Sequence, residues 1–130
     1  MSSAANPFAA FEGQKYLSLE TFRKSGVGVR TPIWFAAEKD RAAVLYIYTI
    51  GETGKVKRIR NNPRVRIAPC DMRGNVTGEF VEARAEILSG DLASHGTRLL
   101  NRKYFPLKQI LGFFALFSRR ERVVMALRPV

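Results

Sequence analysis

The chain has 130 residues, 46% of them hydrophobic, which predicts one folded domain over residues 1–130 rather than a disordered chain. Its single cysteine excludes an internal disulfide, and its apolar runs are shorter than the roughly 20 residues of a membrane-spanning helix. The formal net charge of +11 favours an anionic partner, which is a phosphorylated cofactor, a nucleic acid or an anionic membrane.

The first part of the chain predicts a loose arm followed by two strands. Residues 1–12 form the expected arm, with a helical turn at Phe8–Phe11, and they lack the features of a secretory signal, so a cytoplasmic location is expected. Polar and apolar residues alternate from Tyr16 to Arg23, which is typical of a strand, and Val29–Ala37 is expected to return beside it. Pro32 has no N–H to donate to a neighbouring strand, so it is expected at a strand edge or a bulge.

A short basic helix between two strands forms the centre of the sequence. Ala43–Thr49 is rich in β-branched and aromatic residues, which predicts a half-buried strand. Gly54–Asn61 is predicted to be a helix with Thr53 as its N-cap, because the threonine hydroxyl can accept a hydrogen bond from a free amide of the first turn. Pro63 disfavours helical geometry at the residue before it and ends the helix, and another strand is expected up to Cys70.

The charge of this helix is unusual at its N-terminal end. Lys55 and Lys57 lie in the first turn, where the positive end of the helix dipole disfavours cations by a few tenths of a kcal/mol or more. An anion bound at this end accounts for the lysines, and phosphate is the usual one. A solvated basic face on a surface helix accounts for them as well, and the charge alone leaves both interpretations open.

The last part of the chain predicts two more strands and two helices. Gly78–Leu88 is expected to be a long strand, followed by a helix from Gly90 to about Tyr104, a very apolar helix over Leu107–Phe117 and a final strand over Arg122–Leu127. Six or so strands in hairpin order, with short inserted helices, predict a mainly β protein built as an antiparallel barrel. The apolar residues Phe113–Phe117 are expected in the core or in an interface.

Four further residues are candidates for a functional role. Cys70 is a lone thiol with apolar neighbours, so an inert core cysteine is expected, and His95 is interpreted as a surface histidine rather than a general acid or base. Arg64 and Arg66 either add positive charge near a phosphate or lie on a solvated strand face. The sequence contains no pair of carboxylates at a spacing that would indicate acid–base catalysis, no metal-ligand cluster and no nucleophile motif.

Three short motifs resemble the flavin-phosphate segment of the pyridoxamine 5′-phosphate oxidase-like split barrels. They are Tyr48-Thr49, Thr53-Gly54-Lys55 and Asn61-Asn62-Pro63-Arg64-Val65, in the order and spacing of that family. The chain departs from the family pattern at Thr53, where serine is usual, and at Gly54, where arginine is usual. The loss of that arginine removes one phosphate ligand, which Lys57 or Arg58 can replace.

The resemblance continues through Lys15-Tyr16-Leu17, Thr31–Phe35 and Val65–Leu88, and it is greatest to the branch of probable deazaflavin-dependent enzymes, which use coenzyme F-420. It implies a split β-barrel, a homodimer with the cofactor between the subunits, and either coenzyme F-420 or FMN as the cofactor. The residues that it places at the cofactor are Thr31, Pro32, Ile33, Trp34, Tyr48, Thr49, Thr53, Gly54, Lys55 and Lys57. Strand packing is the alternative role for Tyr48 and Thr49, and core packing for Trp34.

These observations leave three classes of function open. The leading one is an oxidoreductase that transfers hydride between reduced deazaflavin, or FMN, and a small organic substrate, without a reactive protein side chain, because the hydride chemistry belongs to the cofactor. The second is a non-catalytic carrier or sensor of the same fold that holds flavin or haem. A nucleic-acid binder is the third, but the basic residues are not interleaved with aromatic ones and no nucleic-acid motif is present.

Overall fold

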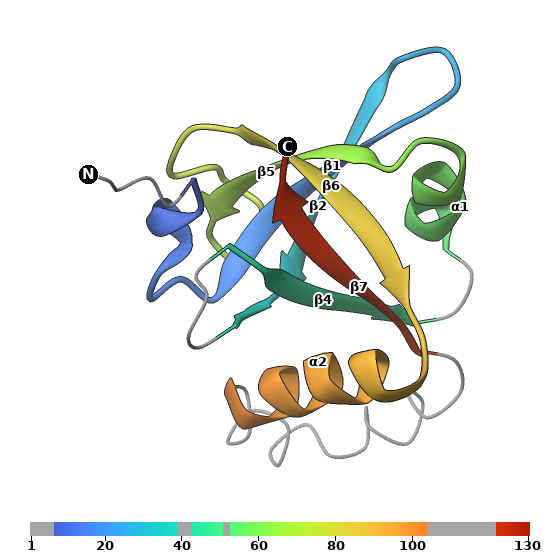
Figure 1. The fold of residues 1–130 in the computed structure, drawn as a ribbon. Helices are drawn as coiled ribbons and strands as arrows, with labels where there is room; N and C mark the ends of the chain where they lie inside the picture. Colours follow the sequence, from blue (N-terminus) through green and yellow to red (C-terminus); the bar gives the residue numbers. More distant parts are fainter. Residues whose placement is uncertain (1–6, 39–42, 51–52, 104–121) are drawn as a thin grey trace.

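The computed structural model describes residues 7–38, 43–50, 53–103 and 122–130. These residues form seven strands, two α-helices and a short 3-10 helix (Figure 1). In chain order the elements are η1 (Ala9–Phe11), β1 (Tyr16–Phe22), β2 (Gly28–Trp34), β3 (Ala36–Ala37), β4 (Leu45–Ile50), α1 (Gly54–Asn61), β5 (Arg64–Cys70), β6 (Val81–Leu88), α2 (Gly90–Lys103) and β7 (Arg122–Pro129).

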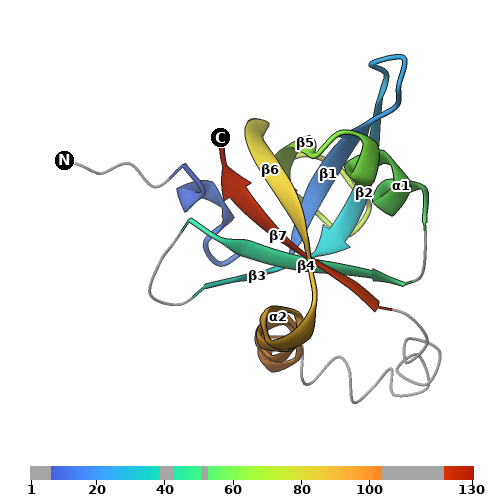
Figure 2. The same ribbon diagram turned by 45° about the vertical axis from the view of Figure 1, so that its right-hand side comes forward.

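The strands form one antiparallel sheet in the order β2-β1-β5-β6-β7-β4-β3. The edge strands β2 and β3 are consecutive in the chain, with only Phe35 between them, so the sheet curves back on itself and encloses a core (Figures 1 and 2). This is the predicted mainly β, antiparallel split barrel. Pro32 lies in edge strand β2, opposite Ser18 of β1, and an edge strand is one of the places in a sheet where proline is tolerated.

Alternation along the strands separates the barrel interior from its outer surface. In β6, Ala83 and Ala85 are buried while Glu82, Arg84 and Glu86 are exposed. The same period of two in the other strands brings one continuous set of apolar side chains together. The buried core of the barrel consists of Phe8, Phe11, Leu17, Leu19, Phe35, Leu45, Ile47, Ile59, Val65, Ile67, Ala83, Ala85, Met125 and Leu127.

Helix α2 packs against the outer surface of β4 and β7, and Figure 2 shows it nearly end-on beneath β4. A second cluster of buried side chains lies between the helix and the strands and includes Tyr46, Leu100 and Val124. Gly96 permits the close approach, because a Cβ at this position would lie 2.9 Å from Cδ1 of Tyr46 and 3.1 Å from Cγ1 of Val124. The small residue at position 96 therefore sets how tightly α2 is docked.

Replacing this glycine by a branched residue is expected to destabilise the fold. Gly96→Val would force the valine methyls against Tyr46 and Val124, and overpacking of this kind costs about 1–3 kcal/mol. The measurement is chemical denaturation of the wild type and the variant. Ser94→Ala, at an exposed position of the same helix, is the matched control and is expected to change stability by less than about 0.5 kcal/mol.

Several boundaries differ from the sequence-based predictions. The strand predicted over Val29–Ala37 is two strands, because Phe35 turns its ring into the core and interrupts the ladder. The strand predicted from Gly78 begins only at Val81. Phe8 and Phe11 of the expected arm are buried in the core, so the described part of that arm is packed rather than loose. The predicted helix over Leu107–Phe117, with its apolar segment Phe113–Phe117, lies outside the described residues.

Candidate functional site

A cavity of about 400 Å³ opens on the outer surface of the barrel, where β1, β2 and β4 meet the start of α1. This volume lies within the range of small-molecule and cofactor sites, which is about 300–1,000 Å³. The residues that line the cavity are Tyr16, Pro32, Ile33, Trp34, Tyr48, Thr49, Thr53, Lys55 and Met72. Residues distant in sequence therefore converge on one concave surface.

Most of the predicted cofactor residues line this one cavity. The exceptions are Thr31, Gly54 and Lys57. Thr31 lies in β2 opposite Leu19, and its hydroxyl oxygen is buried without a hydrogen-bond partner among the described residues. Lys57 is exposed on α1, and Gly54 is the first residue of that helix. The geometry thus favours Lys55 over Lys57 as the residue that meets a ligand.

One end of the cavity is polar and contains two unpartnered hydroxyl groups. Thr49 and Thr53 both line the cavity, and neither Oγ1 atom has a hydrogen-bond partner among the described residues, although both atoms are buried. The prediction that the Thr53 hydroxyl caps α1 is wrong, since only its backbone carbonyl accepts, from the N–H of Lys57 at 3.2 Å. A buried hydroxyl without a partner costs free energy, which a bound ligand with acceptor and donor atoms would recover.

Lys55 brings positive charge to the same end of the cavity. Burial lowers the pKa of its ammonium group, and the nearby positive charge of Arg58 lowers that pKa further. The first turn of α1 contains no acidic residue that would compensate for these cations. An anion bound beside Lys55 and the N-terminus of the helix would be stabilised by the ammonium group, the free amides and the helix dipole.

The other end of the cavity is aromatic and apolar. The rings of Tyr16 and Trp34 have centroids 6.5 Å apart at an angle of 48°, and Tyr48 lines the same cavity from β4. Met72 is 68% exposed at the cavity and lies in the turn after β5. A planar ring system with one negatively charged group matches a cavity with an aromatic side and a cationic end.

Tyr16 and Met72 were not among the predicted site residues. Tyr16 lies in a segment of family resemblance, and its pairing with Trp34 across the β1–β2 ladder could have indicated it. Met72 is placed by its turn, in which the Asp71 carboxylate accepts hydrogen bonds from the N–H groups of Arg73 and Asn75, both at 2.9 Å. Nothing in the sequence around Met72 distinguishes it from any other residue of a polar turn.

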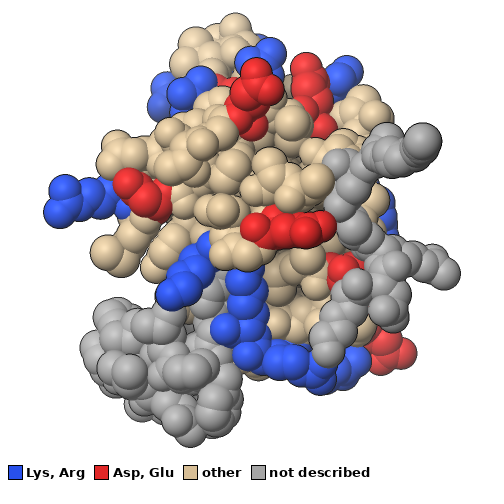
Figure 3. Space-filling view, turned by 90° about the vertical axis from the view of Figure 1, so that its left-hand side faces the viewer, with Lys and Arg blue, Asp and Glu red and all other residues tan. Residues whose placement is uncertain are grey.

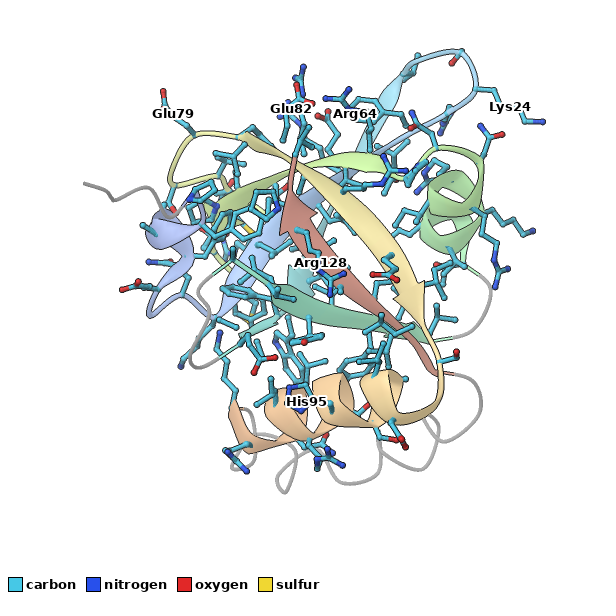
Figure 4. The ribbon with its side chains drawn as sticks, in the orientation of Figure 1. Lys24, Arg64, Glu79, Glu82, His95 and Arg128 are labelled. Atoms are coloured by element: carbon cyan, nitrogen blue, oxygen red, sulfur yellow. The ribbon has the colours of Figure 1, made fainter. Side chains whose placement is uncertain are left out.

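Two arginines that follow α1, Arg64 and Arg66, lie where a role at the cavity is not indicated. Arg64 donates to Glu82 at 2.9 Å in an exposed ion pair, which Figure 4 shows at the edge of the barrel, and Arg66 is also exposed. Both residues belong to the solvated strand face that the sequence offered as the alternative. Cys70 is buried and the pKa of its thiol is raised by that burial, which agrees with an inert core cysteine.

His95, interpreted from the sequence as a surface histidine, is partly exposed but also has a polar partner. Figure 4 shows it on the side of α2 that faces the sheet, where its Nε2 lies 2.9 Å from Oε1 of Glu38. The hydroxyl of Tyr46 donates to the same carboxylate oxygen at 2.9 Å, and the rings of His95 and Tyr46 meet edge to face at 5.6 Å. This cluster joins α2 to β4 and to the residue after β3.

Tyr46 should give the protein a measurable loss of stability at alkaline pH. Burial, followed by the hydrogen bond to Glu38 and the charge of Glu38, raises the pKa of Tyr46 from 10.0 to about 12. The folded state therefore retains this proton where the unfolded state loses it, so stability is complete below pH 10 and falls between pH 10 and 12. The loss from this group is on the order of 2 kcal/mol. Chemical denaturation between pH 10 and 12 should show this fall in the free energy of unfolding for the wild type but not for Tyr46→Phe. An equal dependence on pH in the two proteins would contradict the raised pKa of Tyr46.

The described part of the chain holds no group of three or more histidine, cysteine or acidic residues that could bind a metal ion. Within the same residues, no helix has the length and apolar character needed to cross a membrane. On the face in Figure 3, acidic side chains are scattered among the basic ones and much of the described surface is uncharged. Several basic side chains nevertheless lie next to one another across the lower part of that face.

No protein-family model matches the chain, and no curated protein sequence matches it. Solved structures are similar in fold. An F420 reductase is 21% identical with a TM-score of 0.61, and the alignment covers 95% of this chain and 92% of that one. A Listeria innocua protein titled a putative pyridoxamine 5′-phosphate oxidase is 15% identical, with coverage of 95% and 90% and a TM-score of 0.62. The haem storage protein HutZ from Vibrio cholerae is 14% identical, with coverage of 92% and 84% and a TM-score of 0.64.

These similarities define the class of fold. The chain has the antiparallel split-barrel fold that these solved structures share, with a cavity lined by cationic and aromatic side chains.

Proposed function

We propose that this protein is an oxidoreductase that binds coenzyme F-420, or FMN, in the described cavity and transfers hydride between that cofactor and a small organic substrate. The observation that carries the proposal is the pairing of two ends in one cavity of about 400 Å³. The cationic end contains Lys55 and the unpartnered hydroxyls of Thr49 and Thr53, and the aromatic end contains Trp34 and Tyr16.

The residues present fit a phosphate at the cationic end. The ammonium group of Lys55 supplies a charge-assisted hydrogen bond, and the hydroxyls of Thr49 and Thr53 each have donor and acceptor capacity that the described protein does not use. The free amides at the start of α1 add further donors. All of these groups bind the cofactor without taking part in the reaction.

The residues of the aromatic end fit a planar ring. Trp34 and Tyr16 provide apolar surface for one side of the ring, and Pro32 and Ile33 extend that surface along β2. A bound deazaflavin or flavin supplies the hydride chemistry itself, so this chain needs to bind, orient and shield the ring. Met72, largely exposed at the cavity, is positioned to contact what lies over the ring.

Catalysis is tested by a single-turnover experiment. Reduced F-420 or reduced FMN is bound to the protein and mixed with candidate acceptors, and the absorbance of the oxidised cofactor is followed over time. The proposal predicts oxidation that is faster on the protein than in solution for at least one acceptor. Tight binding with no acceleration for any acceptor would instead support a carrier or sensor, the alternative favoured by the similarity in fold to HutZ.

We also propose that the protein is a homodimer with the cofactor between the subunits. The cavity is open on the outer surface of the barrel, so a second subunit is suited to cover the exposed side of a bound ring. Light scattering at micromolar concentrations should give a mass about twice the 14.7 kDa of one chain. A mass of one chain across that range, with and without cofactor, would contradict this prediction.

A further inference from the structure

The side chain of Arg58, from the last turn of α1, reaches back to the first turn of the helix. Gly54 and Arg58 lie four residues apart on the same face of the helix. A Cβ at Gly54 would lie 2.8 Å from Nη1 of Arg58 and 3.5 Å from its Cζ. The guanidinium group therefore lies against the helix N-terminus, in the space that any side chain at position 54 would occupy.

A hydrogen bond holds this guanidinium group in place. Its Nε donates to Oγ1 of Thr21, at 2.7 Å, from a residue of β1 that is completely buried. Because Nε is engaged in this way, the fork of Nη1 and Nη2 remains directed toward the start of the helix. Arginine is suited to such a position, since its planar fork matches the oxygens of a phosphate.

The surroundings of Arg58 favour an anion. The first turn of α1 contains no acidic residue, and the charge of Arg58 acts on Lys55, which lines the cavity. Two cations held close together next to the positive end of a helix repel each other unless an anion lies between them. The arrangement thus favours an anion beside Lys55 and Arg58.

A second observation points to a ligand at the same place. Thr49 is only 5% exposed and lines the cavity, and its hydroxyl oxygen has no hydrogen-bond partner among the described residues. Thr53, the residue before Gly54, also lines the cavity, and its hydroxyl oxygen is likewise buried without a hydrogen-bond partner among the described residues. Both hydroxyls lie at the end of the cavity where Lys55 and the helix N-terminus meet.

We propose that Arg58 is a second cationic ligand of the phosphate group and reaches it through the space that Gly54 leaves open. Neither Arg58 nor Lys57 belongs to the cavity lining itself, but Lys57, the other candidate for this role, is exposed on the helix, whereas Arg58 is half-buried and its charge acts on Lys55. The inference rests on the proposed function for the identity of the cofactor, but it concerns an oxyanion site that inorganic phosphate can also occupy.

The test uses inorganic phosphate, FMN and riboflavin, which lacks the phosphate. Phosphate binding is followed by NMR at the backbone amides of Gly54 and Lys55, and flavin binding by calorimetry. Arg58→Gln is expected to weaken binding of phosphate and FMN roughly 10- to 100-fold, the usual effect of losing a charge-assisted hydrogen bond. Riboflavin binding is expected to change less than about threefold, because it makes no contact with the oxyanion site.

Two further variants separate ligand binding from a structural role. Thr21→Val removes the hydrogen bond to Nε but keeps the guanidinium charge, so its effect on phosphate is expected to be several-fold smaller than that of Arg58→Gln. The double variant Gly54→Arg with Arg58→Gln returns a guanidinium group to the same space from position 54, and it is expected to recover most of the lost affinity. Loss of a merely structural contact would not be recovered in this way.

The outcomes distinguish this inference from the proposed function. The wild-type protein can bind phosphate, lose that binding in Arg58→Gln, and bind neither flavin nor deazaflavin. This result would support the oxyanion site and overturn the proposal that the protein binds F-420 or FMN. Unchanged phosphate and FMN affinity in Arg58→Gln would overturn the role of Arg58 and leave the cofactor proposal intact. Absence of any shift at Gly54 and Lys55 with phosphate in the wild type would also overturn it.

Discussion

The Lys55→Ala variant is expected to bind coenzyme F-420 and FMN about 1.5–3 kcal/mol more weakly than the wild type, the scale of one charge-assisted hydrogen bond. This corresponds to roughly a 10- to 150-fold rise in Kd. Lys55 lines the cavity, and burial already lowers the pKa of its ammonium group, so the charge is held where a phosphate would be most stabilising. Calorimetry with each cofactor measures the change.

Lys57→Ala is the matched control for this variant. It removes the same charge from the same helical turn, but at an exposed position outside the cavity lining, so it should cost much less affinity. Equal losses in the two variants would mean that only the general field of α1 matters. Unchanged affinity in Lys55→Ala, with the fold intact, would remove Lys55 from the site.

The second large effect is expected in the core. Met125 is fully buried in β7, between Ile47 of β4 and Ile87 of β6. Met125→Ala removes methylene and thioether groups that contact both neighbouring strands and leaves a cavity, which costs about 2–5 kcal/mol. Since domains have total stabilities of about 5–15 kcal/mol, this one substitution would remove a large fraction of the free energy of unfolding. Chemical denaturation measures the free energy of unfolding.

Two substitutions serve as controls for Met125→Ala. Met125→Leu keeps the volume and is expected to cost less than about 1.5 kcal/mol. Met72→Ala makes the same chemical change at a side chain that is 68% exposed, and is expected to alter stability by less than about 0.5 kcal/mol. A loss below 1 kcal/mol in Met125→Ala would contradict the packing of β4, β6 and β7 around this residue.

Much of the fold follows from local patterns in the sequence. The helix Gly54–Asn61 was predicted with its observed bounds, because the glycine break before it and Pro63 after it act within a few residues. The break at Phe35 could not be predicted in this way. It depends on the contact of that ring with Phe11, 5.8 Å away between centroids, and so on the folding of the N-terminal segment onto the barrel.

The lining of the candidate cavity was predicted best where its side chains are close in sequence. Thr53 and Lys55 lie together at the start of α1, and the β2 residues Pro32–Trp34 follow one another along a strand, so both groups could be assigned from short motifs. Arg58 required the structure, since its relation to Gly54 and Thr21 depends on how α1 packs against β1. Contacts between segments distant in sequence, such as that of His95 with Glu38, produce no local sequence pattern and so could not be predicted.

Binding of the intact cofactor is the direct test that the cavity is a site for a phosphorylated flavin or deazaflavin. The wild-type protein is titrated in a calorimeter with coenzyme F-420, FMN and riboflavin at 150 mM salt and again at a higher salt concentration. We expect that F-420 or FMN binds, that FMN binds more tightly than riboflavin, and that this affinity changes little with salt, because one buried phosphate is screened far less than an exposed charged surface. Absence of binding by both phosphorylated cofactors, alongside nanomolar, sequence-dependent binding of duplex DNA at 150 mM salt, would contradict it.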